Sequence, residues 1–256
     1  MLEELYAGSI QDSARRSETV SVSSLERVIE SSPKALDALE FFAPREKIHV
    51  LAEIKRASPS KGDLASISNP VALAKEYQAS GASGISVLTE ERKFKGSLAD
   101  LKQVRSEVSI PVLRKDFIAN EYQLLEARAA GADIALLIVA GLDKSALIRL
   151  KRFTEQLGMT AFVETHNRAE VEIALEAGSQ FIGVNARDLS TFETDRDLFA
   201  SLVHLFPEGV IKVAESAVRN SSDVRHYHEA GADVVLVGEA LVTNDPSTTL
   251  RSFLEV

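Results

Sequence analysis

The sequence predicts an α/β protein, a (β/α)8 TIM barrel with an N-terminal helical extension. The 256 residues match the roughly 250 that such a barrel needs. A phrase also recurs in which a helical stretch meets a glycine and a β-branched apolar run follows: YQASGASGISVL, EARAAGADIALLI, IALEAGSQFIGV and YHEAGADVVLVG. Glycine just past a helix end can adopt the left-handed conformation without steric cost. Each phrase therefore predicts a helix, a short loop and a strand.

The spacing of these glycines predicts further units between them. Gly81, Gly131, Gly178 and Gly231 are separated by 50, 47 and 53 residues, and each gap has room for two βα units of about 25 residues. Eight alternating strands and helices favour a closed parallel barrel, with a doubly wound open sheet as the alternative. The expected strands are His49–Lys55, Gly84–Thr89, Pro111–Lys115, Ile134–Val139, Thr160–Thr165, Phe181–Asn185, Ile211–Glu215 and Val234–Val237.

The strands are nearly continuous apolar runs, as expected for parallel strands that are covered on both faces. Residues 1–46 stand outside the repeat, and within them Ser24–Ser31 and Pro33–Leu39 are predicted to be short helices. We expect this extension to pack on the barrel of residues 47–256. Because no linker or low-complexity tract interrupts the sequence, we expect one domain over residues 1–256.

Composition and charge exclude several classes of function. A net charge of −9 repels phosphate backbones and anionic lipids, which argues against nucleic-acid and membrane partners. The chain has no cysteine, so disulfides, thiolate catalysis and cysteine-bound metals are excluded. No apolar run approaches the roughly 20 residues of a membrane span. The first residues do not resemble a secretory signal, and we expect a cytoplasmic protein.

Polar residues gather where the predicted strands end. Residues two apart on a strand share a face, so Glu53 and Lys55 are expected to point the same way. Catalysis in such barrels takes place at the carboxyl ends of the strands. Any one of these charges could be a solvated strand end, but six on one rim favour an active site. Three acids and three bases permit internal pairing and leave cations for an anionic substrate: Glu53, Glu164, Glu215, Lys55, Lys115 and Arg187.

The loops after the last two strands predict a phosphate site. Barrels frequently hold phosphate there, on backbone N–H groups and at a helix N-terminus. These loops begin with Ser216-Ala217 and Gly238-Glu239, and Ser58 lies in a serine-rich loop after the first strand. Phe94 and Phe117 follow the second and third strands, where they either stack on an aromatic substrate or pack within the loops.

The sequence predicts neither a metal site nor a nucleotide cofactor. The five histidines form no HExxH pattern and are interpreted as surface or supporting residues. Neither GxGxxG nor GxxxxGK[ST] occurs, so the motifs that bind dinucleotides and nucleoside triphosphates are absent.

Six segments carry a resemblance to a known family. LAEIKRASPSKG, LTEERKFKGS, PVLRKDFI, FVETH, IGVNARDL and VAES resemble, in this order and spacing, indole-3-glycerol-phosphate synthase, over essentially the whole chain. The resemblance implies a substrate, 1-(2-carboxyphenylamino)-1-deoxyribulose 5-phosphate, whose ring is closed with loss of carbon dioxide and water in tryptophan biosynthesis. It implies no cofactor, and we expect a monomer.

The resemblance also implies catalytic roles. Lys115 would be the general acid that protonates the ketose carbonyl, and Glu164 a general acid/base in later steps. Lys55 would contact the substrate carboxylate and deliver a proton during dehydration. Glu53 and Asn185 would hold the sugar hydroxyls and the lysines in place.

Binding roles follow in the same way. Substrate binding would involve Arg187 at the carboxylate, Phe94 and Phe117 flanking the aromatic ring, and Glu215 and Ser216 lining the pocket. Phosphate binding would involve Ser58, Ala217, Gly238 and Glu239. Two positions depart from the family pattern: Ala217 stands where glycine is frequent, and Glu239 where some members have a small hydroxyl residue.

Two alternative functions remain open. Other phosphate-binding barrels of the pathway are phosphoribosylanthranilate isomerase, which would be expected to use a cysteine, and the tryptophan synthase α subunit, which would not need the KRASPSKG loop. A barrel that has lost catalysis could instead serve as a binding scaffold. The complete set of strand-end residues argues against this last alternative.

Overall fold

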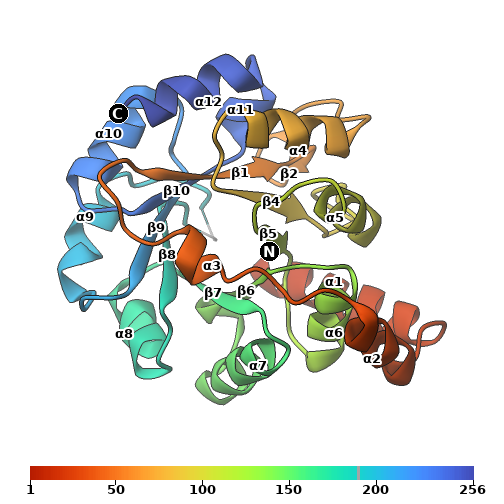
Figure 1. Cartoon of the computed structure of the whole chain (residues 1–256). Helices are drawn as coiled ribbons and strands as arrows, with labels where there is room; N and C mark the ends of the chain where they lie inside the picture. Colours follow the sequence, from red (N-terminus) through yellow and green to blue (C-terminus); the bar gives the residue numbers. More distant parts are fainter. Residues whose placement is uncertain (189–190) are drawn as a thin grey trace.

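The computed structural model describes residues 1–188 and 191–256, and in them eight parallel strands close into a barrel (Figure 1). The order around the barrel is β1-β10-β9-β8-β7-β6-β5-β4. The predicted (β/α)8 barrel is therefore confirmed, and the doubly wound sheet is excluded. The strands are β1 His49–Ile54, β4 Gly84–Leu88, β5 Val112–Lys115, β6 Ile134–Ile138, β7 Thr160–Thr165, β8 Phe181–Asn185, β9 Ile211–Glu215 and β10 Val234–Val237.

The predicted strands agree closely with these bounds. β7 to β10 begin and end as predicted, and each of the other four is one residue shorter at one end. The four glycines after helices take the left-handed conformation, with φ between 70° and 102°. Glycine at the end of a helix was therefore a sound signal for the following strand.

Helices alternate with the strands and surround the barrel (Figure 1). Asparagine side chains cap α4, α6, α8 and α10 by accepting backbone N–H groups of the first turn, which satisfies donors that a helix leaves free. The helices are α4 Pro70–Ala79, α5 Leu98–Arg105, α6 Glu121–Ala129, α7 Lys144–Gln156, α8 Arg168–Glu176, α9 Leu198–Leu202, α10 Ser221–Glu229, α11 Glu239–Val242 and α12 Pro246–Leu254, with short 3₁₀ helices η1 Val139–Gly141 and η2 Val203–Leu205.

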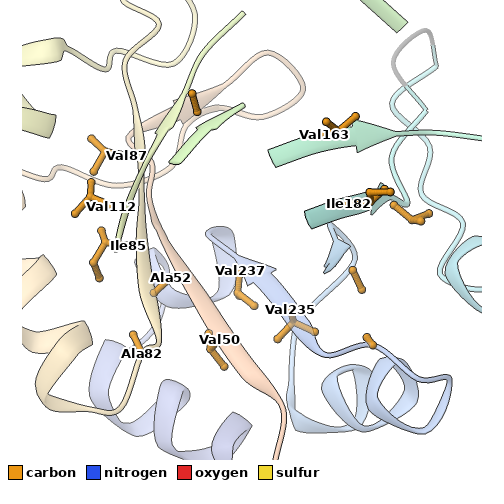
Figure 2. Packing of buried hydrophobic residues seen from close by; sticks show 14 of the residues in the cluster. Val50, Ala52, Ala82, Ile85, Val87, Val112, Val163, Ile182, Val235 and Val237 are labelled. Carbon is orange, nitrogen blue, oxygen red and sulfur yellow. The ribbon is translucent and has the colours of Figure 1, made fainter. Parts of the chain in front are cut away.

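The strands divide their side chains between two apolar layers. Outward-facing residues pack under the helices, and Figure 2 shows part of this layer, with Val50 and Ala52 of β1 beside Val235 and Val237 of β10. The alternate residues fill the barrel interior, among them Leu51, Leu113, Phe162, Phe181, Val213 and Val234. The interior is a packed core, so the space for chemistry lies above it, at the carboxyl ends of the strands.

The N-terminal extension reaches both ends of the barrel through α1 Leu2–Ser17, α2 Val22–Ser31 and α3 Ala38–Phe41. At the carboxyl end, Tyr6 of α1 packs edge-on against Phe117, with ring centroids 5.7 Å apart. Just after α3, Phe42 stacks on Phe181 near the amino ends of the strands, at 5.3 Å. The extension therefore covers the interior core at the amino ends of the strands and borders the barrel mouth at their carboxyl ends.

The predicted helix Pro33–Leu39 is wrong, because residues 33–37 are not helical. The side chain of Asp37 accepts the N–H of Leu39 and so begins the short helix α3 at Ala38. The N–H of Leu36 donates instead to Asp133 of the barrel, at 2.7 Å. The helix predicted over Ser24–Ser31 is present and begins two residues earlier, whereas α1 was not predicted.

A two-stranded hairpin, β2 Ala57–Ser58 and β3 Gly62–Asp63, stands in the loop after β1. None of the helices in the described ranges, 1–188 and 191–256, combines the length and the apolar character needed to cross a membrane.

Candidate active site

A cavity of about 750 Å³ opens at the carboxyl ends of the barrel strands. All the residues predicted from the sequence to form the site line this cavity: Glu53, Lys55, Ser58, Phe94, Lys115, Phe117, Glu164, Asn185, Arg187, Glu215, Ser216, Ala217, Gly238 and Glu239. They come from seven different strands or the loops that follow them, which the closed barrel brings to one rim.

Lys115 lies at the centre of the charged residues. It ends β5, and its Nζ lies 2.9 Å from Oε2 of Glu164 and 2.9 Å from Oε2 of Glu215. The two glutamates come from β7 and β9 and are buried. The strand-end charges therefore pair across the barrel mouth, as the balance of charge in the sequence suggested.

The close packing of these groups shifts their acid–base properties. Burial disfavours the charged form of Lys115, but Glu164, Glu215 and Glu53 outweigh it and raise the lysine pKa. Burial likewise opposes ionisation of Glu164, yet Lys115 and His166 hold its pKa well below the usual range. Burial and the charge of Glu164 raise the pKa of Glu215 to about 8. Near neutral pH the site therefore holds an ammonium, a carboxylate and a protonated acid in contact.

A second ion pair lies on β1 and in the loop after it. Nζ of Lys55 contacts Oε1 of Glu53 at 2.8 Å, so the two side chains share a face as alternation predicted. Gly238, at the end of β10, makes room for this carboxylate, because a Cβ there would lie 2.5 Å from Oε1 of Glu53. Glycine at this position is therefore a packing requirement of the site.

Asn185 at the end of β8 links three strands. Its amide donates to Glu164 at 3.1 Å, and its carbonyl oxygen accepts from the hydroxyl of Ser216 at 2.8 Å. The same oxygen accepts the backbone N–H of Arg187 at 3.0 Å, and the guanidinium of Arg187 donates to the Phe192 carbonyl. Asn185 therefore sets the position of Glu164 and of the loop that carries Arg187.

One of the two predicted phosphate loops has an unusual backbone. Ser216 and Ala217 both adopt the left-handed conformation, with φ of 68° and 56°, at a cost of about 1–2 kcal/mol per residue. Glycine would adopt this conformation without that cost. Gly238 and Glu239 begin α11, and the Glu239 carboxylate pairs with Lys61 of the loop after β1. This ion pair brings the Ser58 hairpin toward the loop after β10.

Phe94 and Phe117 lie beside each other, with ring centroids 6.0 Å apart. The backbone N–H of Phe94 donates to the carboxylate of Glu90 at 2.8 Å, which fixes the loop after β4. Rings that contact each other form one wall, whereas a ring clamped between them would need them further apart. The pair therefore provides an apolar wall, with Tyr6 behind Phe117.

Sequence reasoning missed several residues that shape the cavity. Leu2 and Leu5 of α1 line it, but the buried face of α1 also carries Gly8, Ser9 and other small or polar residues, which obscures a helical period. Gly183 in β8 also shapes the cavity and was missed. A Cβ at this position would collide with the side chains of Glu215 and Phe162. A glycine inside a predicted strand was the available signal.

Gly238→Ala should reduce kcat/KM about 100-fold, because displacing a catalytic group by about 1 Å costs that much. The added methyl group would push Glu53 out of its place beside Lys55. Steady-state kinetics checks this, with Gly178→Ala as the control. Gly178 has a φ of 70° and nothing within 4 Å of its Cβ position, so that change should lower stability and leave kcat/KM unaltered. Equal kcat/KM values in the two variants would refute the role of Gly238.

Comparisons with solved structures support the fold. The chain aligns with N-acetylmannosamine-6-phosphate 2-epimerase from Clostridium perfringens at a TM-score of 0.64 and 13% identity, over 86% of this chain and 97% of that one. It aligns with thiamine phosphate pyrophosphorylase from Pyrococcus furiosus at 0.61 and 13%, over 81% and 94%. At such low identity these likenesses concern the barrel alone.

Comparisons of sequence are more specific. A family model described as indole-3-glycerol phosphate synthase matches residues 2–253. A protein of that name from Leifsonia xyli is 55% identical over 99% of this chain and 97% of its own length. Others are 54% identical in Parafrankia sp. (96% and 91%) and 53% in Mycobacteroides abscessus (96% and 90%). The chain belongs to the indole-3-glycerol phosphate synthase family.

Proposed function

We propose that this chain, a carboxy-lyase of tryptophan biosynthesis by its family, uses Lys115 and Glu164 as its principal acid–base groups. It converts 1-(2-carboxyphenylamino)-1-deoxyribulose 5-phosphate to indole-3-glycerol phosphate by ring closure, decarboxylation and dehydration. The observation that carries the residue assignment is the ammonium of Lys115, held 2.9 Å from two buried carboxylates in a cavity large enough for the substrate.

Ring closure needs an acid at the ketose carbonyl. The aromatic carbon that bears the carboxylate attacks the carbonyl carbon, and the carbonyl oxygen gains negative charge as its π bond breaks. Lys115 donates a proton to this oxygen, which becomes a hydroxyl group. A positioned general acid typically contributes about 10²–10⁴ in rate. Glu215, whose pKa of about 8 keeps it protonated near neutrality, lies 2.9 Å away and can return a proton to Lys115.

Decarboxylation and dehydration follow on the same side of the cavity. The carboxylate leaves as carbon dioxide, and the electrons of the broken bond return to the ring system. The new hydroxyl group then leaves as water, which requires a proton donor at that oxygen and a base for the proton that is lost. Lys55 serves as the donor and Glu164, held as a carboxylate, as the base. No step is a redox reaction, so the scheme calls for no redox cofactor.

Substrate binding divides between the two sides of the cavity. The phosphate lies at the backbone N–H groups of the loops that begin with Ser216-Ala217 and Gly238-Glu239, near Ser58, where the start of a helix favours an anion. Arg187 and Lys55 hold the aromatic carboxylate. The aromatic ring lies against the wall formed by Phe94 and Phe117, and Glu53 and Asn185 contact the sugar hydroxyls.

We also propose that residues 1–256 act as one domain, as a monomer in the cytoplasm, where phosphorylated biosynthetic intermediates are retained. The packing of Tyr6 and Phe42 on the barrel supports one domain. The net charge of −9 supports the absence of nucleic-acid and anionic-membrane partners, since like charges repel.

A fluorescence assay tests the proposed function. Purified protein should convert the substrate to a product with indole emission, without added metal or nucleotide, and the chain contains no tryptophan that would obscure it. Failure of the protein to form an indole, with the substrate still bound, would contradict catalysis and favour a binding scaffold. Failure of both would refute the assigned reaction.

A further inference from the structure

His166 lies next to the acid–base cluster but outside the cavity lining. It follows β7 directly, two residues after Glu164, and its ring is largely buried. Its Nε2 lies 3.2 Å from Oε1 of Glu164, and its Nδ1 lies 3.1 Å from Oε2 of Glu170. Since it is not among the residues that line the cavity, it can influence the reaction only through a neighbour.

The ring is fixed from the side away from the cavity. Glu170 of α8 accepts both the backbone N–H of His166, at 2.8 Å, and Nδ1 of its ring. The other carboxylate oxygen of Glu170 accepts the side-chain amide of Asn167, at 2.7 Å. Because Glu170 is itself held on both oxygens, the imidazole has one preferred orientation, with Nε2 facing Glu164.

Both ring nitrogens therefore face carboxylate oxygens, which accept hydrogen bonds and donate none when ionised. The doubly protonated imidazolium suits this arrangement, because each N–H then meets an acceptor. Burial opposes the charge, but Glu164 and Glu170 overcome it and raise the pKa of His166 to about 10. Nε2 has no hydrogen-bond partner among the described residues, so its 3.2 Å contact with Oε1 of Glu164 acts as an ion pair.

Among the charged groups near the His166 ring, Glu164 is the one that belongs to the acid–base cluster. Lys115 of β5 contacts the other oxygen of Glu164, and Asn185 of β8 shares Oε1 with the ring. Arg168 of α8 is directed elsewhere, toward His204 and Glu172. Glu164 thus lies between two cations, Lys115 on the cavity side and His166 behind it.

We propose that His166, oriented by Glu170, is a positioning residue that keeps Glu164 ionised and aimed at Lys115. This inference rests on the proposed role of Glu164 as an acid–base group. The three side chains form a line from the cavity wall outward, Glu164, His166 and Glu170, in which the outer carboxylate fixes the imidazolium and the imidazolium fixes the inner carboxylate. Hydrogen-bonded partners behind a functional side chain serve a comparable purpose at metal sites.

The pH dependence of kcat/KM tests this proposal. His166→Gln retains a donor but removes the charge, so the pKa of Glu164 should rise, since a carboxylate loses a stabilising cation. The acid limb of the profile should move about one unit to higher pH, as expected for one close charge. At neutral pH kcat should fall about tenfold, in the range seen for outer-shell partners, with KM within about twofold of wild type because no substrate contact is lost.

Two further variants complete the experiment. His204→Gln changes an exposed histidine and should leave the profile as in wild type. Glu170→Gln should move the acid limb in the same direction as His166→Gln, but by a smaller amount. It replaces His166→Gln as the test variant if His166→Gln does not fold. An acid limb that stays in place in both variants would overturn the proposal, even if their thermal stability falls. If wild type forms no indole, the proposed function fails instead, and the two failures are thereby distinguished.

Discussion

Lys115→Ala should lower kcat about 1,000-fold, within the range expected for loss of a general acid. KM should change less than about tenfold, because the phosphate loops, Arg187 and the aromatic wall are untouched and uniform binding is retained. Without the ammonium, the Glu164 carboxylate and the protonated Glu215 have no cation between them, so the pKa of Glu164 should rise. The variant therefore loses both the donor and the charge state of the cluster.

Steady-state kinetics and equilibrium binding of the substrate, measured side by side, check this prediction. Lys102→Ala is the matched control, since Lys102 is an exposed lysine of α5. A small alkylammonium added to Lys115→Ala should restore part of the lost rate by entering the space left by the side chain. Turnover close to wild type in Lys115→Ala would refute the assignment of the general acid.

Arg114→Met should lower the free energy of unfolding by about 3–5 kcal/mol, the cost of leaving a buried charge without its partner. Arg114 precedes Lys115 but points to the other side of β5, away from the cavity. Its side chain is fully buried and donates to Asp116 at 2.9 Å, to Thr89 at 3.1 Å and to the carbonyl of Gln123. Methionine fills the volume but leaves the Asp116 carboxylate without this cation.

The effect should depend on pH. Burial disfavours the charge on Asp116, but Arg114 and the hydrogen bonds from Thr89 and the Phe117 N–H outweigh it and lower the aspartate pKa. A depressed pKa adds stability above the unfolded-state pKa of about 3.9, and that stability is lost as pH falls through the folded-state value. The difference between wild type and Arg114→Met should therefore be largest near neutrality and shrink in acid.

Urea unfolding followed by circular dichroism measures both effects. Arg149→Met is the control, because Arg149 forms an exposed ion pair with Glu121, and such pairs contribute about 0–1 kcal/mol. An Arg114→Met protein as stable as this control at neutral pH would contradict the account of the buried network.

The fold could be predicted because its signals are local. A glycine that ends a helix and the apolar run after it lie within a few residues, so Gly81 or Gly231 marks the next strand without knowledge of the rest of the chain. Helix α1 could not be found in this way. Its buried face includes Ser9 and Asp12, which are polar because they meet partners such as Asp116 and Arg92. These contacts join residues that are 107 and 80 positions apart in the sequence.

The sequence predicted which residues lie at the rim of the barrel, but not which of them contact one another. Alternation placed Glu53 beside Lys55, and the barrel rule placed Lys115 near the other strand ends. The sequence could not show that Lys115 meets both Glu164 and Glu215, because these contacts depend on the closure and tilt of the barrel. The departure at Ala217 places a non-glycine residue in the left-handed conformation, with φ of 56°, at a cost of about 1–2 kcal/mol. His166 stands two residues after Glu164, just past the end of β7, so its proximity could have been predicted but not its place outside the cavity lining.

In the proposed function, one cluster of acids and bases closes the ring and expels both carbon dioxide and water. The most direct measurement follows substrate consumption, carbon dioxide release and indole formation together in one reaction of the purified protein. We expect equal amounts of all three throughout the time course. Substrate consumed without carbon dioxide, as an isomerase would do, or carbon dioxide released without an indole, would contradict it.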